Sequence, residues 1–380
     1  MAKKNSSGKY IKCSGYEAFV PNALPPDLNW TERLIRSLSD ADRFIGLLSG
    51  EGKKQPNPHL LIRPFIKREA VMSSRIEGTQ ATLGELLASD AGAAVDRSPD
   101  DLREVGNYVA ALDHGIKRLN TLPLSLRLIR EIHEKLMEGV HGSYAAPGQF
   151  RKTQNWIGPA GCTLQNAVYI PPPPELLMDC LGKWEQFLHV QTIPPLVQAG
   201  LLHYQFEAIH PFLDGNGRVG RLLIILFLLE RKVLASPLLY ISAFFEATRD
   251  EYYDRLLAVS QKSQWNSWLE YFLNCIARMS EDVLDRAERI NLLLEKWKKE
   301  VAGRKPKILM NAVELLAENP FWTAKKLSER MQVAFTTAQR SINVLVEQKI
   351  LFQVDKVQRD RVFVAKAIMK IFDEPPKIKT

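Results

Sequence analysis

The side chains best suited to chemistry are concentrated in one segment, residues 210–221, which reads HPFLDGNGRVGR. His210 is the group in this segment that can accept a proton near neutral pH. Asp214 could bind a divalent cation, because Mg²⁺ commonly takes one or two carboxylates together with phosphate oxygens. Arg218 and Arg221 are three residues apart, so on a helix they would share one face. These residue types predict proton abstraction beside a bound Mg²⁺-nucleotide.

An apolar run positions this segment. Residues 222–229 (LLIILFLL) can only be buried, and the glycines before them and the charged residues 230–232 after them favour a helix over a strand. Gly215, Asn216 and Gly217 then lie at the helix N-terminus, where unpaired backbone N–H groups and the helix dipole favour an anion. We therefore expect a polyphosphate at this end of the helix. The sequence contains no Walker-type P-loop, so this phosphate site is of another kind.

Residues 210–221 match the Fic family signature His-x-Phe-x-(Asp/Glu)-Gly-Asn-Gly-Arg-x-x-Arg at every specified position, and the chain resembles that family. The resemblance implies an enzyme that transfers AMP from ATP to a Ser, Thr or Tyr hydroxyl of a target protein, releasing pyrophosphate. It implies that His210 is the general base and that Asp214 holds Mg²⁺. The ATP-binding residues implied are Gly215, Asn216, Gly217, Arg218, Val219, Gly220, Arg221 and Tyr252. Tyr252 or Tyr253 would stack on the adenine, although aromatic residues at such spacing are more often part of a core.

A second feature of the resemblance concerns regulation. Residues 73–78 (SSRIEG) fit the inhibitory pattern (Ser/Thr)-x-x-x-Glu-(Gly/Asn) of many Fic proteins. Ser73 and Glu77 are four residues apart and would share one helix face, and Gly78 is a natural helix stop. The resemblance implies that Glu77 pairs with Arg221 and occupies the space of the ATP γ-phosphate. Without the family, the same pattern would indicate only a solvated glutamate near a helix end.

Residues 147–171 predict a β-hairpin between the two motifs. Short apolar runs are separated by Gly, Pro and Asn, and the prolines at 171–174 end the hairpin because they cannot donate to a ladder. The resemblance implies that this hairpin is a flap that docks the target by strand-like pairing. The docking residues would be Trp156, Ile157, Tyr169 and Ile170. The alternative is an ordinary surface hairpin with its tryptophan packed inward.

Composition indicates a globular protein, since the 380 residues are 46% hydrophobic and sufficient for two or three domains. The four cysteines are not closely paired in the sequence, which argues against a zinc site and against a disulfide framework. They are Cys13, Cys162, Cys180 and Cys275. The first residues lack an apolar signal core, and the longest apolar run, 222–229, is far shorter than the ~20 residues that span a bilayer. We therefore expect a soluble, cytoplasmic protein with no membrane partner.

The C-terminal residues carry most of the net charge. Residues 301–380 contain 15 Lys and Arg against 8 Asp and Glu, which is +7 of the whole chain's +8. Three helical stretches followed by two alternating segments, 350–354 and 361–364, look like a winged helix-turn-helix. Its recognition helix would lie in a DNA groove, and the residues placed near base edges or phosphates would be Thr336, Thr337, Gln339 and Arg340. Because many winged helices bind protein or dimerise instead, DNA, a protein partner and a homodimer all stay open.

The expected fold is mainly α: a Fic-type helical bundle with a β-hairpin flap, plus a small C-terminal winged helix-turn-helix domain. The expected divisions are 1–104, an N-terminal helical region with the inhibitory motif, 105–303, the Fic core, and 304–380, the winged helix. A loop is expected at 49–58 and a linker at 303–306. Core helices are expected in 105–118, 124–139, 175–189, 196–209, 251–260 and 265–299.

Two functions of different classes are compatible with these patterns. The first is a protein adenylyltransferase inhibited by Glu77. The second is a regulator that binds DNA or protein through residues 304–380 and whose Fic core has another activity, with a different nucleotide, phosphotransfer or removal of AMP. The intact motif favours the first function. Because residues 301–380 hold +7 and the remainder about +1, removing residues 301–380 should leave auto-labelling intact and remove most of any nucleic-acid affinity.

Overall fold

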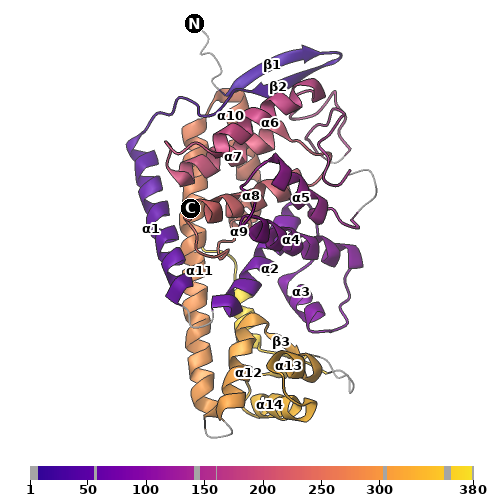
Figure 1. Cartoon of the computed structure of the whole chain (residues 1–380), viewed down its shortest axis with the longest axis vertical. Helices are drawn as coiled ribbons and strands as arrows, with labels where there is room; N and C mark the ends of the chain where they lie inside the picture. The colour runs from indigo at the N-terminus through magenta and orange to yellow at the C-terminus, as the bar shows by residue number, and fades with distance from the viewer. Residues whose placement is uncertain are drawn as a thin grey trace.

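The computed structural model describes residues 7–54, 58–140, 146–159, 161–302, 306–354 and 361–378. Within these ranges the chain is mainly helical, as predicted (Figure 1). The first eleven helices are α1 (Glu32–Lys54), α2 (Pro58–Ile76), α3 (Leu83–Asp90), α4 (Pro99–Arg118), α5 (Leu126–Leu136), α6 (Pro174–Leu188), α7 (Pro195–Ile209), α8 (Asn216–Glu230), α9 (Ser242–Ala247), α10 (Arg249–Lys262) and α11 (Trp265–Val301). None of the helices among the described residues is long and apolar enough to cross a membrane.

Helices α7 and α8 form the centre of the bundle. Almost every side chain of both helices is buried, including the apolar run 222–228 of α8. A helix that is apolar on all sides must be enclosed by other elements, and α8 contacts α2, α4, α5 and α7. The long helix α11 runs along the bundle with α1 beside it (Figure 1). The segment between α7 and α8, residues 210–215, therefore lies between two firmly held helices.

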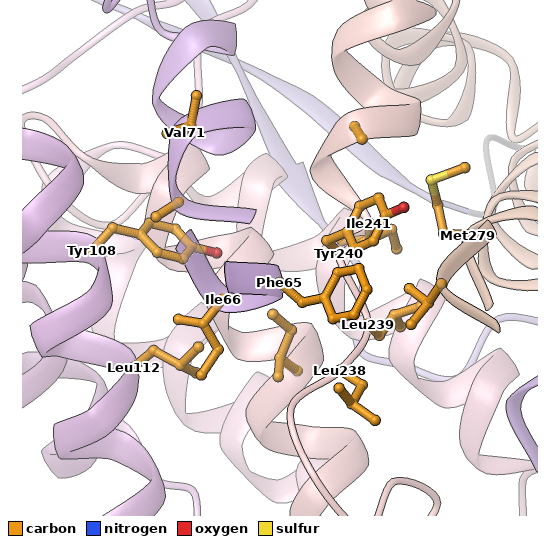
Figure 2. Packing of buried hydrophobic residues seen from close by; sticks show 14 of the residues in the cluster. Phe65, Ile66, Val71, Tyr108, Leu112, Leu238, Leu239, Tyr240, Ile241 and Met279 are labelled. Carbon is orange, nitrogen blue, oxygen red and sulfur yellow. The ribbon is translucent and has the colours of Figure 1, made fainter. Parts of the chain in front are cut away.

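Helix α2 is packed along most of its length. Phe65 stacks on Tyr240 with ring centroids 5.7 Å apart, and Ile66 and Val71 are buried. Figure 2 shows these side chains among residues of α4, of the segment before α9, and of α11. The buried carboxylate of Glu69 accepts hydrogen bonds from Ser242 N–H and from the Tyr108 hydroxyl. This packing fixes the end of α2, which carries the second motif, against α8.

Several elements differ from the sequence-based expectation. Helix α1 continues to Lys54, so the predicted loop at 49–58 is wrong for 49–54 and at Pro58, where α2 begins, while 55–57 lie outside the described residues. Gly50 and Gly52 are poor helix formers, but packing of α1 along α11 outweighs that preference. The hairpin of β1 (Gly8–Cys13) and β2 (Tyr16–Pro21) and the short helices α3 and α9 were not predicted.

The C-terminal part, residues 306–378, combines helices with a small antiparallel sheet. Its elements are α12 (Pro306–Glu318), β3 (Phe321–Thr323), α13 (Ala324–Met331), α14 (Phe335–Glu347), β4 (Phe352–Gln353), β5 (Val362–Val364) and α15 (Lys366–Asp373). The strand order is β3-β5-β4. The order from α12 to β5 is helix, strand, two helices and two strands. This order is compatible with a winged helix-turn-helix, and the assignment stays a prediction. The structure adds β3 and α15 to what the sequence suggested.

The C-terminal part packs firmly against the rest of the chain. Helix α12 contacts both α2 and α11, and Phe372 of α15 meets the ring of Phe65 edge-on at 5.5 Å. The backbone carbonyl of Glu374 accepts hydrogen bonds from Arg68 of α2 and Arg286 of α11, each at 2.9 Å. The hydrophobic core is therefore continuous across the predicted boundary at 303/304. Of the predicted linker, residues 303–305 lie outside the described residues.

Candidate active site

His210 ends α7 in a left-handed conformation with φ +50°, which is uncommon for a residue other than glycine. Its backbone carbonyl is held by Arg151 Nε at 2.9 Å and by Asn155 Nδ2 at 3.2 Å. Its ring Nδ1 lies 3.3 Å from the Glu207 carbonyl, which can only accept, so Nδ1 carries the proton. Burial lowers the pKa of His210 to about 4. The side chain is therefore a neutral imidazole at pH 7, with Nε2 unprotonated.

The turn after His210 is closed by Asn216. Its Oδ1 accepts from Phe212 N–H at 2.8 Å and its Nδ2 donates to Phe212 O at 2.9 Å. Gly215 has φ +77°, and a Cβ there would lie 3.0 Å from the sulfur of Met137. Both polar atoms of the Asn216 side chain are thus used within the turn. The expectation that this side chain helps to bind the anion is wrong in this geometry, and only its backbone N–H is placed for that role.

The N-terminus of α8 offers a place for an anion. No side chain caps it, so the N–H groups of its first turn are not satisfied by a capping residue. Arg218 is 3% exposed, yet its Nε and Nη1 have no hydrogen-bond partner. Its nearest carboxylates, Glu104 and Asp214, are 3.5 and 3.7 Å away. A buried guanidinium with unused donors is costly, and an incoming phosphate would satisfy it.

Asp214 is the residue here with an accessible carboxylate. Its side chain is 60% exposed, and Oδ1 accepts from the Gly215 N–H at 2.6 Å. Among the described residues no cluster of three or more His, Cys, Asp or Glu side chains could hold a metal alone. A single carboxylate nevertheless suits Mg²⁺ that arrives with a nucleotide, because that ion keeps waters and phosphate oxygens among its ligands. The donor set therefore fits a metal bound together with ATP.

Glu77 lies directly against this site. Its Oε1 is 2.6 Å from Arg221 Nη2, and Arg221 also donates to Ser73 Oγ at 2.8 Å and to Ser73 O at 2.9 Å. A Cβ on Gly217 would overlap the Glu77 carboxylate, so that carboxylate rests on the first turn of α8. Burial raises the pKa of Glu77, but Arg221 outweighs burial and the pKa lies below its usual value. An ionised carboxylate thus neutralises Arg221.

Three of the predicted ATP-binding residues face elsewhere. Val219 is fully buried in the core, and its N–H donates within the helix to Gly215 O. Gly220 faces α7, where a Cβ would overlap the Glu207 carboxylate. Tyr252 is 1% exposed, and its hydroxyl lies 2.8 Å from His203 Nε2. The assignment of these three residues to ATP contacts is therefore not supported by the geometry.

The neighbour of Tyr252 has the accessible ring. Tyr253 is 41% exposed, and the guanidinium of Arg249 lies 5.9 Å from its ring centroid. Tyr252 instead stacks on Phe245 with centroids 4.4 Å apart. Adjacent residues of a helix point about 100° apart, and here Tyr252 faces the core while Tyr253 faces solvent. Of the two tyrosines considered for the adenine, Tyr253 is the one placed to meet a ligand.

The predicted flap is much less regular than a hairpin. Among its described residues the pairing is a single antiparallel bridge between Ile157 and Tyr169, with Ile157 N–H donating to Tyr169 O at 2.8 Å. The rest of the segment consists of turns and bends, and residue 160 lies outside the described residues. Ile170 O accepts from the N–H of Phe19 in β2 at 2.8 Å. The unpredicted hairpin β1–β2 thus supports the base of the flap.

The two aromatic side chains of the flap behave differently. Trp156 is 41% exposed, and its indole donates to Cys162 O at 3.1 Å, so the alternative of an inward-packed tryptophan is wrong. The Tyr169 hydroxyl donates to Ala208 O at 2.8 Å, next to His210 in α7. Trp156 is therefore available to a partner, whereas Tyr169 ties the flap to the active-site helix.

Sequence reasoning missed Glu207. Its Oε1 is buried without a hydrogen-bond partner, and burial raises its pKa to about 8, far above that of an ordinary glutamate. It lies between the Gly220 backbone and the charge of Arg221. The available signal was the one acidic residue of a largely apolar helix, three positions before His210.

Comparison with known proteins agrees with this geometry. Residues 35–117 match the N-terminal domain of the Fic/DOC family, and residues 123–228 match the Fic/DOC family domain itself. The chain therefore belongs to the Fic/DOC family. The second match contains the whole of the 210–221 motif, and the first contains Ser73 and Glu77.

Individual relatives show how far the similarity reaches. A protein adenylyltransferase Fic of Drosophila erecta is 32% identical over 158 residues, which are 39% of this chain and 29% of that protein. This chain thus spans less than a third of the length of that relative. A Fic family protein of Desulfovibrio desulfuricans superposes with a TM-score of 0.60 at 18% identity, covering 90% of this chain and 98% of the other. A Fic domain containing signaling protein of Bacteroides thetaiotaomicron superposes with a TM-score of 0.52 at 20% identity, covering 68% of this chain and 97% of the other.

Proposed function

We propose that this chain is a protein adenylyltransferase that transfers AMP from ATP to a Ser, Thr or Tyr hydroxyl of a target protein and releases pyrophosphate. The observation that carries the proposal is a neutral His210 beside an uncapped helix N-terminus with an under-bonded Arg218. A neutral imidazole can take a proton, and the positive helix end with its guanidinium can hold a polyphosphate. Relatives named protein adenylyltransferase support the same reaction.

In this reaction the target hydroxyl attacks the α-phosphorus of ATP. His210 Nε2 takes the hydroxyl proton as the new P–O bond forms, and the bond to the leaving pyrophosphate breaks. The backbone N–H groups at the start of α8 and the side chain of Arg218 bind the phosphates. Mg²⁺, which Asp214 would hold, would neutralise phosphate charge when bound with ATP. Such positioning and charge stabilisation supply most of the acceleration in phosphoryl transfer.

Glu77 inhibits this reaction in the proposal. Its carboxylate engages Arg221 and rests on the first turn of α8, where the ATP phosphates would bind. A negative group at that position repels phosphate and also fills its volume. Arg221 becomes a phosphate ligand only after Glu77 withdraws. Ser73 contributes by holding the guanidinium in place through its hydroxyl and its carbonyl.

The flap is the proposed docking site of the target. Trp156 and the partly buried Ile157 and Ile170 lie along an irregular segment whose backbone is only partly paired. An extended peptide could add to such an edge by backbone hydrogen bonds. Because Tyr169 is tied to Ala208 beside His210, a peptide bound here would lie near the base.

The test is nucleotide labelling of the purified protein, with and without Glu77→Gly, by α-labelled ATP, CTP, GTP and UTP in the presence of Mg²⁺. Labelling by ATP above the other three supports adenylyl transfer, and labelling by another nucleotide alone would replace ATP as the substrate. The variant His210→Ala should lower the rate by roughly 10²–10⁴-fold, the usual range for loss of a general base. Equal labelling by this variant would remove His210 from its role.

A second candidate function concerns the C-terminal part. Thr336 and Arg340 are exposed on α14, while Thr337 and Gln339 are partly buried and Gln339 bonds to Asn343 at 2.9 Å. The net charge of +7 in residues 301–380 as a whole would favour DNA or another acidic partner. Binding to duplex DNA should weaken with salt by a slope of about −0.9 for each phosphate neutralised. Absence of salt-sensitive binding would leave a protein-binding or dimerisation module.

A further inference from the structure

His133 joins two loops that flank the candidate active site. It belongs to α5 and is completely buried. Its Nδ1 accepts a hydrogen bond from the Gly148 N–H at 2.9 Å, and its Nε2 lies 3.0 Å from the Asp214 carbonyl oxygen. Its ring stacks on Phe212, with centroids 3.7 Å apart and planes 4° from parallel. The imidazole therefore contacts the active-site turn at two successive points, the ring of Phe212 and the backbone of Asp214.

The two hydrogen bonds allow only one tautomer. A backbone N–H can only donate, so Nδ1 must be unprotonated to accept from Gly148. A carbonyl can only accept, so Nε2 must carry the hydrogen that is donated to Asp214. The ring thus has a defined direction as well as a defined place. A side chain that merely filled volume in the core would need neither bond.

The contacts of His133 are made where the turn needs support. Asp214 and Gly215 form the corner, and the Gly215 N–H is already used by the Asp214 carboxylate at 2.6 Å. Met137, one helical turn after His133, lies under Gly215, and its sulfur is 3.8 Å from Arg218 Nη2. One face of α5 therefore supports the corner and the buried arginine together. The direction of the Asp214 carboxylate depends on how this corner is held.

We propose that His133 is a positioning residue, which fixes the backbone of Asp214 so that the carboxylate of Asp214 and the N-terminus of α8 face the same Mg²⁺-nucleotide. The proposal rests on the proposed function, because it needs a nucleotide at this site. His133 itself does not touch that ligand. Outer residues that orient a metal-binding group typically affect metal affinity by roughly 10–100-fold.

The experiment measures ATP binding by calorimetry with and without Mg²⁺, in the Glu77→Gly background so that inhibition does not mask binding. His133→Phe keeps the ring and its stacking but loses both hydrogen bonds. It should reduce the Mg²⁺-dependent gain in affinity by about tenfold or more and change metal-free binding much less. His133→Gln, whose amide can donate to the Asp214 carbonyl, should retain most of the gain. His133→Asn, whose shorter side chain does not reach, should resemble Phe.

Each outcome decides between the alternatives. An unchanged Mg²⁺ gain in His133→Phe, or an equal gain in the Gln and Asn variants, overturns the positioning role while leaving the proposed function intact. The Gln and Asn comparison also decides the matter if His133→Phe does not fold. Absence of any ATP binding by the Glu77→Gly parent overturns the proposed function, and the role of His133 falls with it. Ile132→Val, a neighbouring core change in α5, is the matched control and should keep the gain.

Discussion

Glu77 and Arg221 are 144 residues apart in the sequence, and their side chains form an ion pair in which Glu77 Oε1 lies 2.6 Å from Arg221 Nη2. The guanidinium is 1% exposed and the carboxylate 35%. Burial alone would lower the pKa of Arg221, but the charge of Glu77 raises it, so the arginine stays charged. A buried cation that loses its partner needs another anion. In the proposed function that anion is a phosphate of ATP.

Glu77→Gly should therefore raise the rate of AMP transfer by about tenfold or more, since a hydrogen bond to a charged group is worth about 1.5–3 kcal/mol. The measurement is auto-labelling at saturating Mg²⁺ and ATP. Glu77→Gln separates charge from volume, because it keeps the size of the side chain and should give only part of the gain. The double variant Glu77→Gly with Arg221→Ala should lose it. No gain in the single variant would show that the ion pair is not inhibitory.

The pH dependence of transfer should follow the low pKa of His210. Burial lowers it to about 4, and the base must be unprotonated to act, so activity is lost as pH falls through that value. We expect kcat/KM in the Glu77→Gly variant to show no acid limb near pH 6.5, the pKa of an ordinary histidine. The measurement is kcat/KM from pH 5 to 8. An acid limb centred near 6.5 would mean that His210 is solvated in the active state.

Glu207 should make the fold less stable as pH rises. Its folded pKa is raised to about 8, so between the ordinary pKa of a glutamate and about 8 the unfolded chain loses a proton that the folded chain keeps. Stability falls with rising pH across that window. The Glu207→Gln side chain cannot ionise. The free energy of unfolding in urea of this variant should therefore increase relative to that of the parent as pH rises from 5 to 8. Glu138→Gln, at a side chain that is 69% exposed, is the matched control. If the free energies of unfolding of the parent and of Glu207→Gln changed with pH in the same way, the carboxyl of Glu207 would not be buried in its neutral form.

Removal of residues 304–380 should destabilise the whole protein, contrary to the expectation of a dispensable C-terminal domain. The truncation uncovers Phe65 and leaves Arg68 and Arg286 without the Glu374 carbonyl. We expect the melting temperature to fall by at least about 5 °C, which corresponds to roughly 3–4 kcal/mol in a protein of this size. Phe372→Ala should shift it in the same direction by less. If the truncated protein had the same melting temperature as the full chain, this interface would contribute nothing to stability.

The sequence predicted best what depends on strong local patterns. The apolar run 222–229 and the largely apolar helix before His210 require burial, and both helices are present with nearly the expected ends. Local patterns could not show the direction of a side chain set by distant packing. Tyr252 and Tyr253 are equivalent in sequence, and only the aromatic cluster around Phe245 determines which one is buried. The Asn216 side chain likewise depends on a turn that no short pattern specifies.

In the flap and in α1, local sequence patterns predicted secondary structure that differs from the structure. Short apolar runs separated by Gly, Pro and Asn predicted a hairpin near Ile157, but hydrogen bonds with Phe19 and Ala208 replace most of the ladder. Helix α1 extends through Gly50 because it packs against α11. Both outcomes depend on contacts between segments far apart in the sequence. The helices and strands of the C-terminal part, by contrast, are compatible with the short-range pattern that predicted a winged helix, and what this part binds stays a prediction.

The hydrogen bonds that Arg68 and Arg286 donate to the Glu374 carbonyl have a thermodynamic consequence. Arg68 lies on the same helix as Ser73, which holds Arg221, so docking of the C-terminal part and pairing of Glu77 share one rigid element. A ligand that binds the C-terminal part differently when it is docked and undocked has a coupling free energy with the nucleotide site. In the proposed function ATP displaces Glu77, and reciprocity then requires that ATP changes the affinity of that ligand by the same factor.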